Sequence, residues 1–386
     1  MSKPTHTPPY SDNLARSTDD LAYWVAFSRI PTLGPRQIGR LKGHFGALGK
    51  AWSAQEQEFI LAGLMPKTVQ AIIIQRQHID PHTELERIRK AGYTALIPGD
   101  QDYPPLLKEI PDAPALLYMR GTLPVGRPSL AVVGTRKASH YGVEVARRLT
   151  AELVSRGFAI VSGLALGIDS IAHQTTLDQR GTTVAVLGSG LDQIYPRTNY
   201  GLSEAIVKSG GTLLSEFPLG MYAQKHHFPI RNRIIAGLSL GTLVIEGGMD
   251  SGSLITAKAA LEYNREVFAV PGDIFRAASE GANQLIKMGA RPVTSADDVV
   301  EALNLGSYKP PAQVDNISHI IDNQSHPSLS DEESVILNLI TREPRHIDEL
   351  VKVSKLQTSV VNSTLMTLEV QGFVRDIGGM HYVRLS

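Results

Sequence analysis

The stretch of residues 129–169 alternates short apolar runs with glycine loops, and this alternation constrains the fold more than any other feature of the chain. An apolar run at residues 130–133 ends at a glycine, and a helical pattern follows over about residues 141–156. A second β-branched run at 159–161 leads into a second glycine loop at 162–169. Short buried strands that alternate with helices indicate β-α-β units in a parallel sheet. Because ligands of such sheets bind beyond the carboxyl ends of the strands, we expect a site at these loops.

Length, composition and charge limit the number of domains and the class of protein. A chain of 386 residues is long enough for two or three domains, and 42% hydrophobic with 20% charged residues is typical of a soluble globular protein. A formal net charge of zero means that any basic surface is a local patch. The chain has no cysteine, which excludes disulfides, thiolate zinc sites and a cysteine nucleophile. No apolar run approaches the roughly 20 residues that span a bilayer, and the N-terminus lacks the apolar core of a signal peptide, so we expect a cytoplasmic protein.

Composition and periodicity divide the chain into five segments. Small polar residues and prolines predict disorder at the N-terminus. Three prolines and little periodicity predict a linker after the α/β core. The predicted segments are a disordered N-terminus (1–18), a helical domain (19–83), a Rossmann-like α/β domain (84–303), the linker (304–328) and a winged helix (329–386).

The predicted fold class is α/β, an extended Rossmann-like parallel sheet with a small helical domain before it and a winged helix after it. The winged helix is predicted from three helices followed by two strands, with Gly378-Gly379 as a tight turn between the strands. In the α/β core, further strands are predicted at residues 183–187, 211–215, 242–246 and 267–270, with edge strands at 94–97 and 115–119.

The helical segment 19–83 contains one glycine turn, at residues 30–41, where Gly34 and Pro35 separate two helices. This turn resembles a helix-hairpin-helix, and the segment resembles domains of the helix-hairpin-helix or SAM type. The amides of such a turn hold a DNA phosphate. The alternative, which we favour slightly because the motif is short and occurs once, is a small helical domain in which the turn only ends one helix and starts the next.

The first glycine loop, Gly134-Thr135-Arg136, has a pattern that suits phosphate. A glycine loop between a strand and a helix points backbone N–H groups at an anion, and an arginine adds a planar fork for phosphate oxygens. Taken alone, a tight turn with a surface arginine explains this loop at least as well. The chain contains neither a P-loop nor a dinucleotide-binding fingerprint after the first strand.

The second glycine loop presents Ser162 and Gly163 at the start of a helix. Asp169 and His173 stand four residues apart in that helix, a spacing that also suits a pair of metal ligands. The positive N-terminus of the helix explains Asp169 better, and His173 shares its face. Because no third ligand accompanies them, we predict no metal ion, and we predict no other cofactor.

The third loop lies in a window without acidic residues, between Glu216 and Glu246. Its basic and aromatic residues gather at 225–233, and a helix is expected from about Ile230. Single strands need cations for their phosphates and an aromatic surface for their bases, so this window suits single-stranded nucleic acid. A solvated basic turn is less probable, because the window coincides with the expected ligand edge. The candidate residues are Lys225, Phe228, Arg231, Asn232 and Arg233.

Two further loops complete the set. Arg197 follows the predicted strand 183–187 by a short loop and adds another cation. A fourth glycine loop, with Ser251, Gly252 and Ser253, ends the strand 242–246 and opens a helix.

In this order the loops resemble the signature of the DNA-processing protein A family (DprA/Smf), over residues 90–300 most strongly. The resemblance implies a cytoplasmic homodimer that binds single-stranded DNA, shields incoming strands during natural transformation and loads the RecA recombinase on them. It places the main DNA contacts at Arg136, Arg197 and Lys225. The matching segments are VGTR at 133–136, SGLALGID at 162–169, LSE at 214–216, FPIRNRII at 228–235, SGSL at 251–254 and VPG at 270–272.

An enzyme is the alternative. The fold also resembles nucleotide phosphoribohydrolases, whose P-G-G-x-G-T-x-x-E loop supplies a catalytic glutamate. The comparable stretch at 246–256 carries a two-residue insertion and has Thr256 where that glutamate should stand. Without this carboxylate no group for acid/base catalysis is evident, so we predict a binding protein and not an enzyme.

Overall fold

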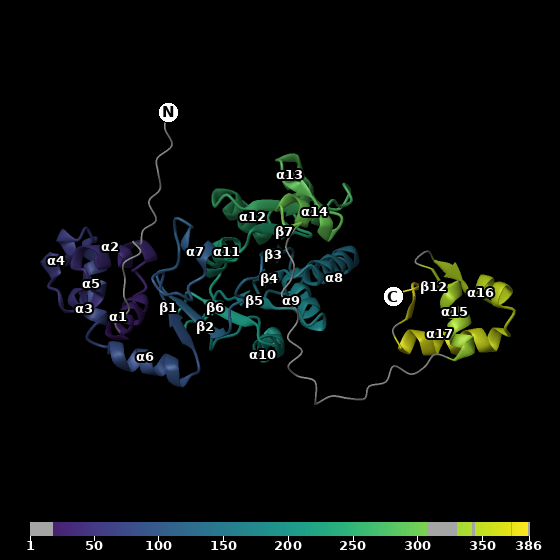
Figure 1. Ribbon diagram of the computed structural model, residues 1–386, viewed down its shortest axis with the longest axis horizontal. Coiled ribbons are helices and arrows are strands. Elements are labelled where there is room, and N and C mark those ends of the chain that lie inside the picture. Colours follow the sequence, from purple (N-terminus) through teal and green to yellow (C-terminus); the bar gives the residue numbers. More distant parts are fainter. Residues whose placement is uncertain (1–17, 307–329, 342–343, 372, 385–386) are drawn as a thin grey trace. The chain divides into compact units, whose positions relative to one another are not determined.

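The protein, seen in a computed structural model, is described at residues 18–306, 330–341, 344–371 and 373–384. It divides into two compact units, Met1–Ala312 and Gln313–Ser386 (Figure 1). The predicted disorder at 1–18 and the predicted linker at 304–328 fall almost entirely outside the described residues, and both stay predictions.

A sheet of nine strands forms the centre of the first unit, in the order β1-β2-β6-β5-β4-β3-β7-β8-β9. Strands β3 to β9 all run parallel, and β2 and β1 add an antiparallel edge beside β6. The predicted α/β class is therefore confirmed. The strands are β1 Thr94–Leu96, β2 Leu117–Gly121, β3 Ser129–Val133, β4 Ala159–Ser162, β5 Thr183–Val186, β6 Thr212–Ser215, β7 Gly241–Val244, β8 Glu266–Ala269 and β9 Arg291–Pro292.

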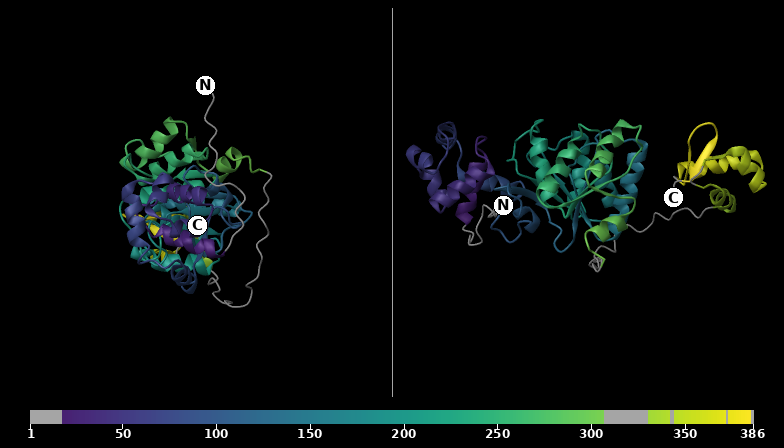
Figure 2. Two further views of the ribbon diagram at one scale, coloured as in Figure 1. Left: turned by 90° about the vertical axis from the view of Figure 1, so that its left-hand side faces the viewer. Right: turned by 90° about the horizontal axis from the view of Figure 1, so that it is seen from above.

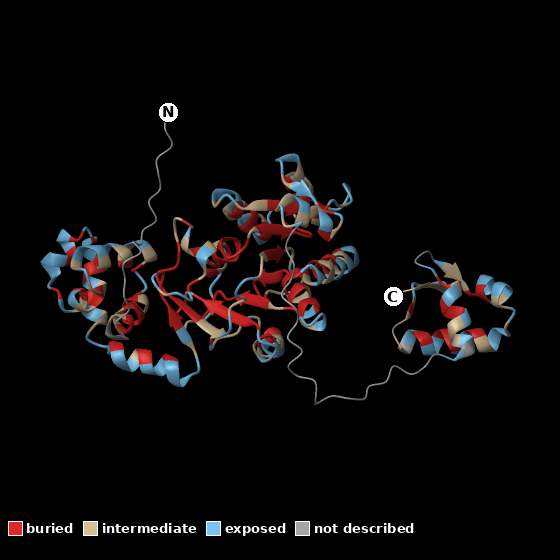
Figure 3. Ribbon diagram, in the orientation of Figure 1, coloured by how far each residue is buried: buried red, intermediate tan, exposed pale blue. Residues whose placement is uncertain are grey.

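Helices cover both faces of this sheet because its central strands are apolar on both sides. Leu130 and Val132 of β3 belong to the core on one face, and Ala131 and Val133 belong to the core on the other. Figure 3 shows the resulting band of buried strands between partly exposed helices. The covering helices are α7 Pro105–Lys108, α8 His140–Ser155, α9 Ile168–Asp178, α10 Tyr200–Lys208, α11 His227–Gly237, α12 Gly252–Glu262, α13 Ala277–Lys287 and α14 Ala296–Ala302, with the 3-10 helix η1 Arg197–Asn199.

Six helices precede the sheet, which confirms the helical N-terminal segment. Trp24 and Phe27 of the first helix are buried in a core that continues onto the sheet. Ser28 Oγ lies 2.7 Å from the Tyr118 hydroxyl of β2, and Arg29 pairs with Glu84 at 2.6 Å. The first contact joins the helical segment to the antiparallel edge, and the second joins the first helix to the sixth. The helices are α1 Thr18–Ser28, α2 Pro35–Phe45, α3 Leu48–Ser53, α4 Glu56–Leu61, α5 Pro66–Gln75 and α6 Pro81–Lys90.

The second unit is a winged helix, as predicted. Three helices enclose a small apolar core, and the three-stranded sheet β10-β12-β11 flanks it. Gly378 and Gly379 have φ angles of 100° and 62°, a left-handed conformation that glycine adopts without strain in the hairpin turn. The elements are α15 Asp331–Leu339, β10 Arg345–His346, α16 Ile347–Ser354, α17 Thr358–Val370, β11 Val374–Asp376 and β12 His381–Arg384.

Across the described parts of both units, no helix combines the length and the apolar character needed to cross a membrane.

His173 is a buried histidine between helix and sheet. Its side chain, on α9, is fully buried, and its Nδ1 lies 2.7 Å from Thr183 Oγ1 of β5. Burial, together with the positive charge of Arg231, lowers the pKa of His173 to about 3. The imidazole is therefore neutral in the folded protein at all moderate pH values.

Stability should fall as the pH drops below the ordinary histidine pKa of 6.5. The pKa of His173 is lower in the folded state, so the unfolded state binds the proton more tightly and stability present above pH 6.5 is lost towards pH 3. One such proton changes the free energy of unfolding by at most about 1.4 kcal/mol per pH unit. We expect His173→Gln to flatten this slope in urea unfolding between pH 6.5 and 4.5. The exposed His226→Gln is the matched control, and an equal slope in the parent and in both variants would contradict the assignment.

Candidate nucleic-acid interface

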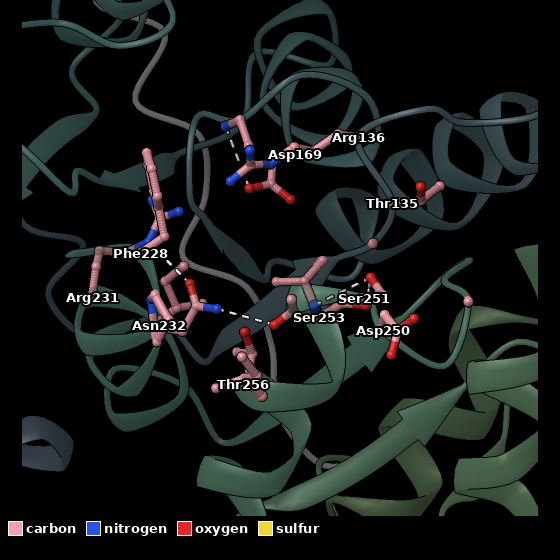
Figure 4. Close-up of a pocket in the computed structure, with 18 of the residues that line it drawn as sticks. Thr135, Arg136, Asp169, Phe228, Arg231, Asn232, Asp250, Ser251, Ser253 and Thr256 are labelled. Carbon is pink, nitrogen blue, oxygen red and sulfur yellow. Dashed lines mark hydrogen bonds between the residues drawn. The ribbon is translucent and has the colours of Figure 1, made fainter. Parts of the chain in front are cut away.

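A cavity of about 900 Å³ opens beyond the carboxyl ends of the central strands (Figure 4). From β3 the chain proceeds to β4, β5 and β6 on one side, whereas β7, β8 and β9 lie on the other. Open α/β sheets bind ligands at such a reversal of strand order. Ten of the predicted site residues line this cavity: Gly134, Thr135, Arg136, Lys225, Phe228, Arg231, Asn232, Ser251, Gly252 and Ser253.

The other four predicted residues lie outside this cavity. Gly163 lines a small adjoining cavity of about 40 Å³, and Arg197 is exposed directly after Pro196, which lines the same small cavity. Ser162 is fully buried and donates its hydroxyl to the carbonyl of Val132.

Arg233 also points away from the cavity, contrary to the expectation from sequence. Its guanidinium donates to Glu216 and lies 3.7 Å from Asp112, with only 11% of the side chain exposed. The structure gives Ser162 and Arg233 structural partners, and we leave both out of the DNA-binding set proposed below.

One wall of the cavity combines cations with aromatic rings. The Arg136 guanidinium lies 5.0 Å from the ring centre of Phe228, within the range of a cation–π contact. Tyr195 packs against the same ring, with the two centres 5.7 Å apart. Arg136 and Lys225 are exposed, so their charges are available to a ligand.

Tyr195 was not predicted as a site residue. It lines both cavities, and 52% of its surface is exposed. The signal that could have revealed it is an aromatic residue two positions before Arg197, in a loop after a strand, because aromatic residues beside cations are typical of single-strand binding surfaces.

Arg231 forms the floor of the cavity and is only 4% exposed. Its Nη1 donates to the carbonyls of Gly163 and Val186, which follow β4 and end β5. A Cβ at Gly163 would lie 2.5 Å from this nitrogen, so the close approach requires glycine. Burial lowers the pKa of Arg231 to about 10, an effect that Asp169 opposes and Arg136 reinforces. The guanidinium is therefore a permanent positive charge at neutral pH.

Asp169 is the buried counter-charge of this floor. Its carboxylate accepts the backbone N–H groups of Gly163 at 3.1 Å and Ala165 at 3.4 Å. Burial raises the pKa of Asp169, whereas Arg231 and these N–H groups act to lower it. Asp169 thus shapes the second glycine loop, and no group of three possible metal ligands occurs in the described part of the chain.

The opposite wall is the N-terminus of α12. Ser251 caps this helix by accepting the N–H of Ser253, and the two hydroxyls lie 2.7 Å apart. Asn232 donates to the carbonyl of Gly252 at 3.1 Å and so ties α11 to this wall. Two exposed carboxylates, Asp250 and Glu280, also line the wall.

Glu246, the first residue of the phosphoribohydrolase-like stretch, is already hydrogen-bonded within the fold. Glu246 is 1% exposed and accepts the backbone N–H of Ser139 at 2.9 Å and its hydroxyl at 2.7 Å. It thereby holds the start of α8, and a Cβ at Gly142 would lie 2.2 Å from its Oε2. Thr256, which stands where the phosphoribohydrolases have their catalytic glutamate, lines the cavity.

Helix α11 begins at His227, three residues earlier than predicted. Pro229 stands in its first turn, where backbone N–H groups have no partner inside the helix, so the missing N–H of proline costs nothing. The early start places Phe228 on the helix beside the cavity.

Two family models match this chain. The family model described as DNA recombination-mediator protein A matches residues 94–304, and the DprA winged helix domain matches residues 322–380. Protein Smf of Synechocystis is 36% identical over 397 aligned positions, which cover 95% of this chain and 100% of that protein. DNA processing protein DprA of Bacillus subtilis is 44% identical over 222 residues, which cover 57% of this chain and 74% of that protein.

Two solved structures resemble the chain. The X-ray structure of DNA processing protein A from Streptococcus pneumoniae has a TM-score of 0.63 at 35% identity and covers 74% of this chain and 98% of its own. DNA processing protein A from Helicobacter pylori, known for its single-stranded DNA binding mode, has a TM-score of 0.50 at 29% identity and covers 56% of this chain and 97% of its own. All the loops that line the large cavity lie within the matched residues 94–304, and the chain belongs to the DNA recombination-mediator protein A family (DprA/Smf).

Proposed function

We propose that this protein captures single-stranded DNA in the large cavity and takes part in DNA processing during transformation and recombination. The observation that carries the proposal is the convergence of exposed cations and aromatic rings, Arg136 and Lys225 with Tyr195 and Phe228, at the reversal of strand order. The relatives named above, one of them with a single-stranded DNA binding mode, support it.

In this proposal the cations and the aromatic rings of the first wall have different tasks. Phosphates bind the wall with Arg136, Lys225 and the nearby Arg197, because each is an exposed cation. Bases stack on Tyr195 and Phe228, a contact that tolerates any base. The bound strand is therefore held without sequence preference.

Further parts of the proposal come from the family. We propose that the protein is a cytoplasmic homodimer, that it shields incoming strands, and that it loads the RecA recombinase on them. We also propose that it performs no chemistry, and the engaged state of Glu246 supports this, because that carboxylate is not available to a substrate.

Arg136→Ala should weaken binding of a fluorescent oligothymidylate and flatten its salt dependence. Each phosphate contact in a single strand contributes a slope of about −0.7 to a plot of log affinity against log salt. Fluorescence anisotropy at several salt concentrations measures both quantities. Lys208→Ala is the matched control, because Lys208 is an exposed cation at the end of α10, before the amino end of β6. A folded Arg136→Ala protein with the affinity and slope of the parent would refute the site.

The dimer and the recombinase contact are tested together. Light scattering of the purified chain at about ten to a hundred micromolar, where a weak interface is still populated, should report twice the mass of one chain. With single-stranded DNA present, the protein should accelerate RecA filament formation. A monomer, or a DNA-bound protein without effect on RecA, would remove that part of the proposal.

The winged helix should contribute little to strand capture. Residues 331–386 contain six Lys/Arg and eight Asp/Glu, and residues 357–371, which correspond to a recognition helix, contain no Lys or Arg. A net negative surface repels phosphates, so we propose a protein-contacting or regulatory role for this unit. A truncated chain that ends at Leu303 should keep most of its affinity for single strands in anisotropy. Loss of most binding by that folded truncation would place the winged helix in the DNA site.

A further inference from the structure

The longest window without acidic residues lies in the helical N-terminal segment and not around the cavity. No Asp or Glu occurs between Asp20 and Glu56. This window contains five basic residues: Arg29, Arg36, Arg40, Lys42 and Lys50. In a chain with zero net charge, such a window concentrates positive charge at one place.

Two of these five cations serve the fold. Arg29 pairs with Glu84, and Lys42 pairs with Asp20 at 2.5 Å. Arg36 and Lys50 are exposed and have neither a hydrogen bond nor an ion pair with any described residue. Arg40 is also exposed and uses one N–H group on the carbonyl of Gly63. The side chains of Arg36 and Lys50, and most N–H groups of the Arg40 side chain, are therefore available to a ligand.

Helix α2 arranges part of this charge in a row. Arg36, Arg40 and His44 are all exposed and stand four residues apart, which places them on one side of the helix at a spacing of about 6 Å along its axis. The opposite side is buried through Ile38 and Leu41. Two guanidinium groups and an imidazole at regular spacing offer N–H groups to the phosphates of an extended nucleic-acid strand.

The start of α2 faces the loop that carries the proposed DNA contacts. Gly34 and Pro35 line a cavity of about 390 Å³ together with Gln224, His226 and His227. Lys225 and Phe228, which alternate with these residues along the loop, line the large cavity instead.

One short loop thus separates the two cavities, and its far side meets the N-terminus of α2. The loop is braced by stacking, because the ring of His227 packs 4.2 Å from Phe217 and His226 packs edge-on against His227. Figure 2 shows the N-terminal helices next to the α/β domain in the view from above.

We infer that α2 extends the DNA track: a single strand that leaves the large cavity crosses the loop at His226 and lays its phosphates along Arg36, Arg40 and His44. The inference rests on the proposed function and adds a second binding surface to it. The chemistry recognised is the phosphodiester backbone, because the guanidinium groups of Arg36 and Arg40 match phosphate oxygens. The positive N-terminal end of α2 lies where the strand arrives and favours the same charge.

Oligonucleotides of different length distinguish the large cavity from the row on α2, because only a long strand reaches both. We would compare oligothymidylates of about 5 and about 20 nucleotides, which are short and long relative to the roughly 4–16 nucleotides that one single-strand-binding domain covers. In the full-length protein, Arg36→Ala/Arg40→Gln should lower the affinity for the long strand roughly fivefold and flatten its salt slope by about 1.4, the contribution of two phosphates. The affinity for the short strand should not change. Arg36→Ala alone should give part of the effect and leaves the Arg40 contact with Gly63 intact.

Lys90→Ala is the control, since Lys90 is exposed on α6 of the same helical segment. The inference would be overturned if both Arg36 variants kept the long-strand affinity of the parent, and an acidic protein partner would then be the alternative ligand of the row. It would also be overturned if the affinity fell equally in the control. An equal loss for short and long strands would also overturn it, because the effect would then come from the large cavity. If the parent binds neither strand, the proposed function fails as well, whereas failure of the length effect alone leaves that function standing.

Discussion

The candidate site depends on one buried guanidinium. Arg231 reaches from α11 to the carbonyls at the ends of β4 and β5 and so holds two loops and a helix in one arrangement. Its charge is balanced by Asp169, which in turn holds the amides of the second glycine loop. The shape of the cavity therefore depends on Arg231 together with Asp169.

Sequence reasoning found the loops of the site because strand ends and glycines are local signals. It could not tell which of the two arginines lines the cavity, although Arg231 forms the cavity floor and Arg233 pairs with Glu216. Residues two apart on a helix point to different sides, so only one of the two can reach the cavity once α11 is placed. The contact between Tyr195 and Phe228 joins residues 33 positions apart, and no local pattern predicts it. The two-residue strand β9 gives no apolar run and was missed for the same reason.

Three acidic residues in and around the cavity are engaged by the fold. Asp169 faces Arg231, Glu216 pairs with Arg233, and Glu246 holds the start of α8. Asp169 and Glu246 are buried, only 10% of the Glu216 side chain is exposed, and each of the three carboxylates has fixed partners in the fold. The exposed Arg136 and Lys225 therefore make their side of the cavity positive, even though the chain as a whole is neutral.

In the proposed function, two exposed carboxylates limit where the DNA strand can lie in the cavity. Asp250 and Glu280 line the wall that also carries the hydroxyls of Ser251 and Ser253. A phosphate close to these carboxylates would be repelled, whereas a base edge with N–H donors would find acceptors there. The backbone is thus directed to the side with Arg136 and Lys225, and from Lys225 the loop leads to His226 and the start of α2. In the proposed function, attraction on one side and repulsion on the other would together give the strand a single path.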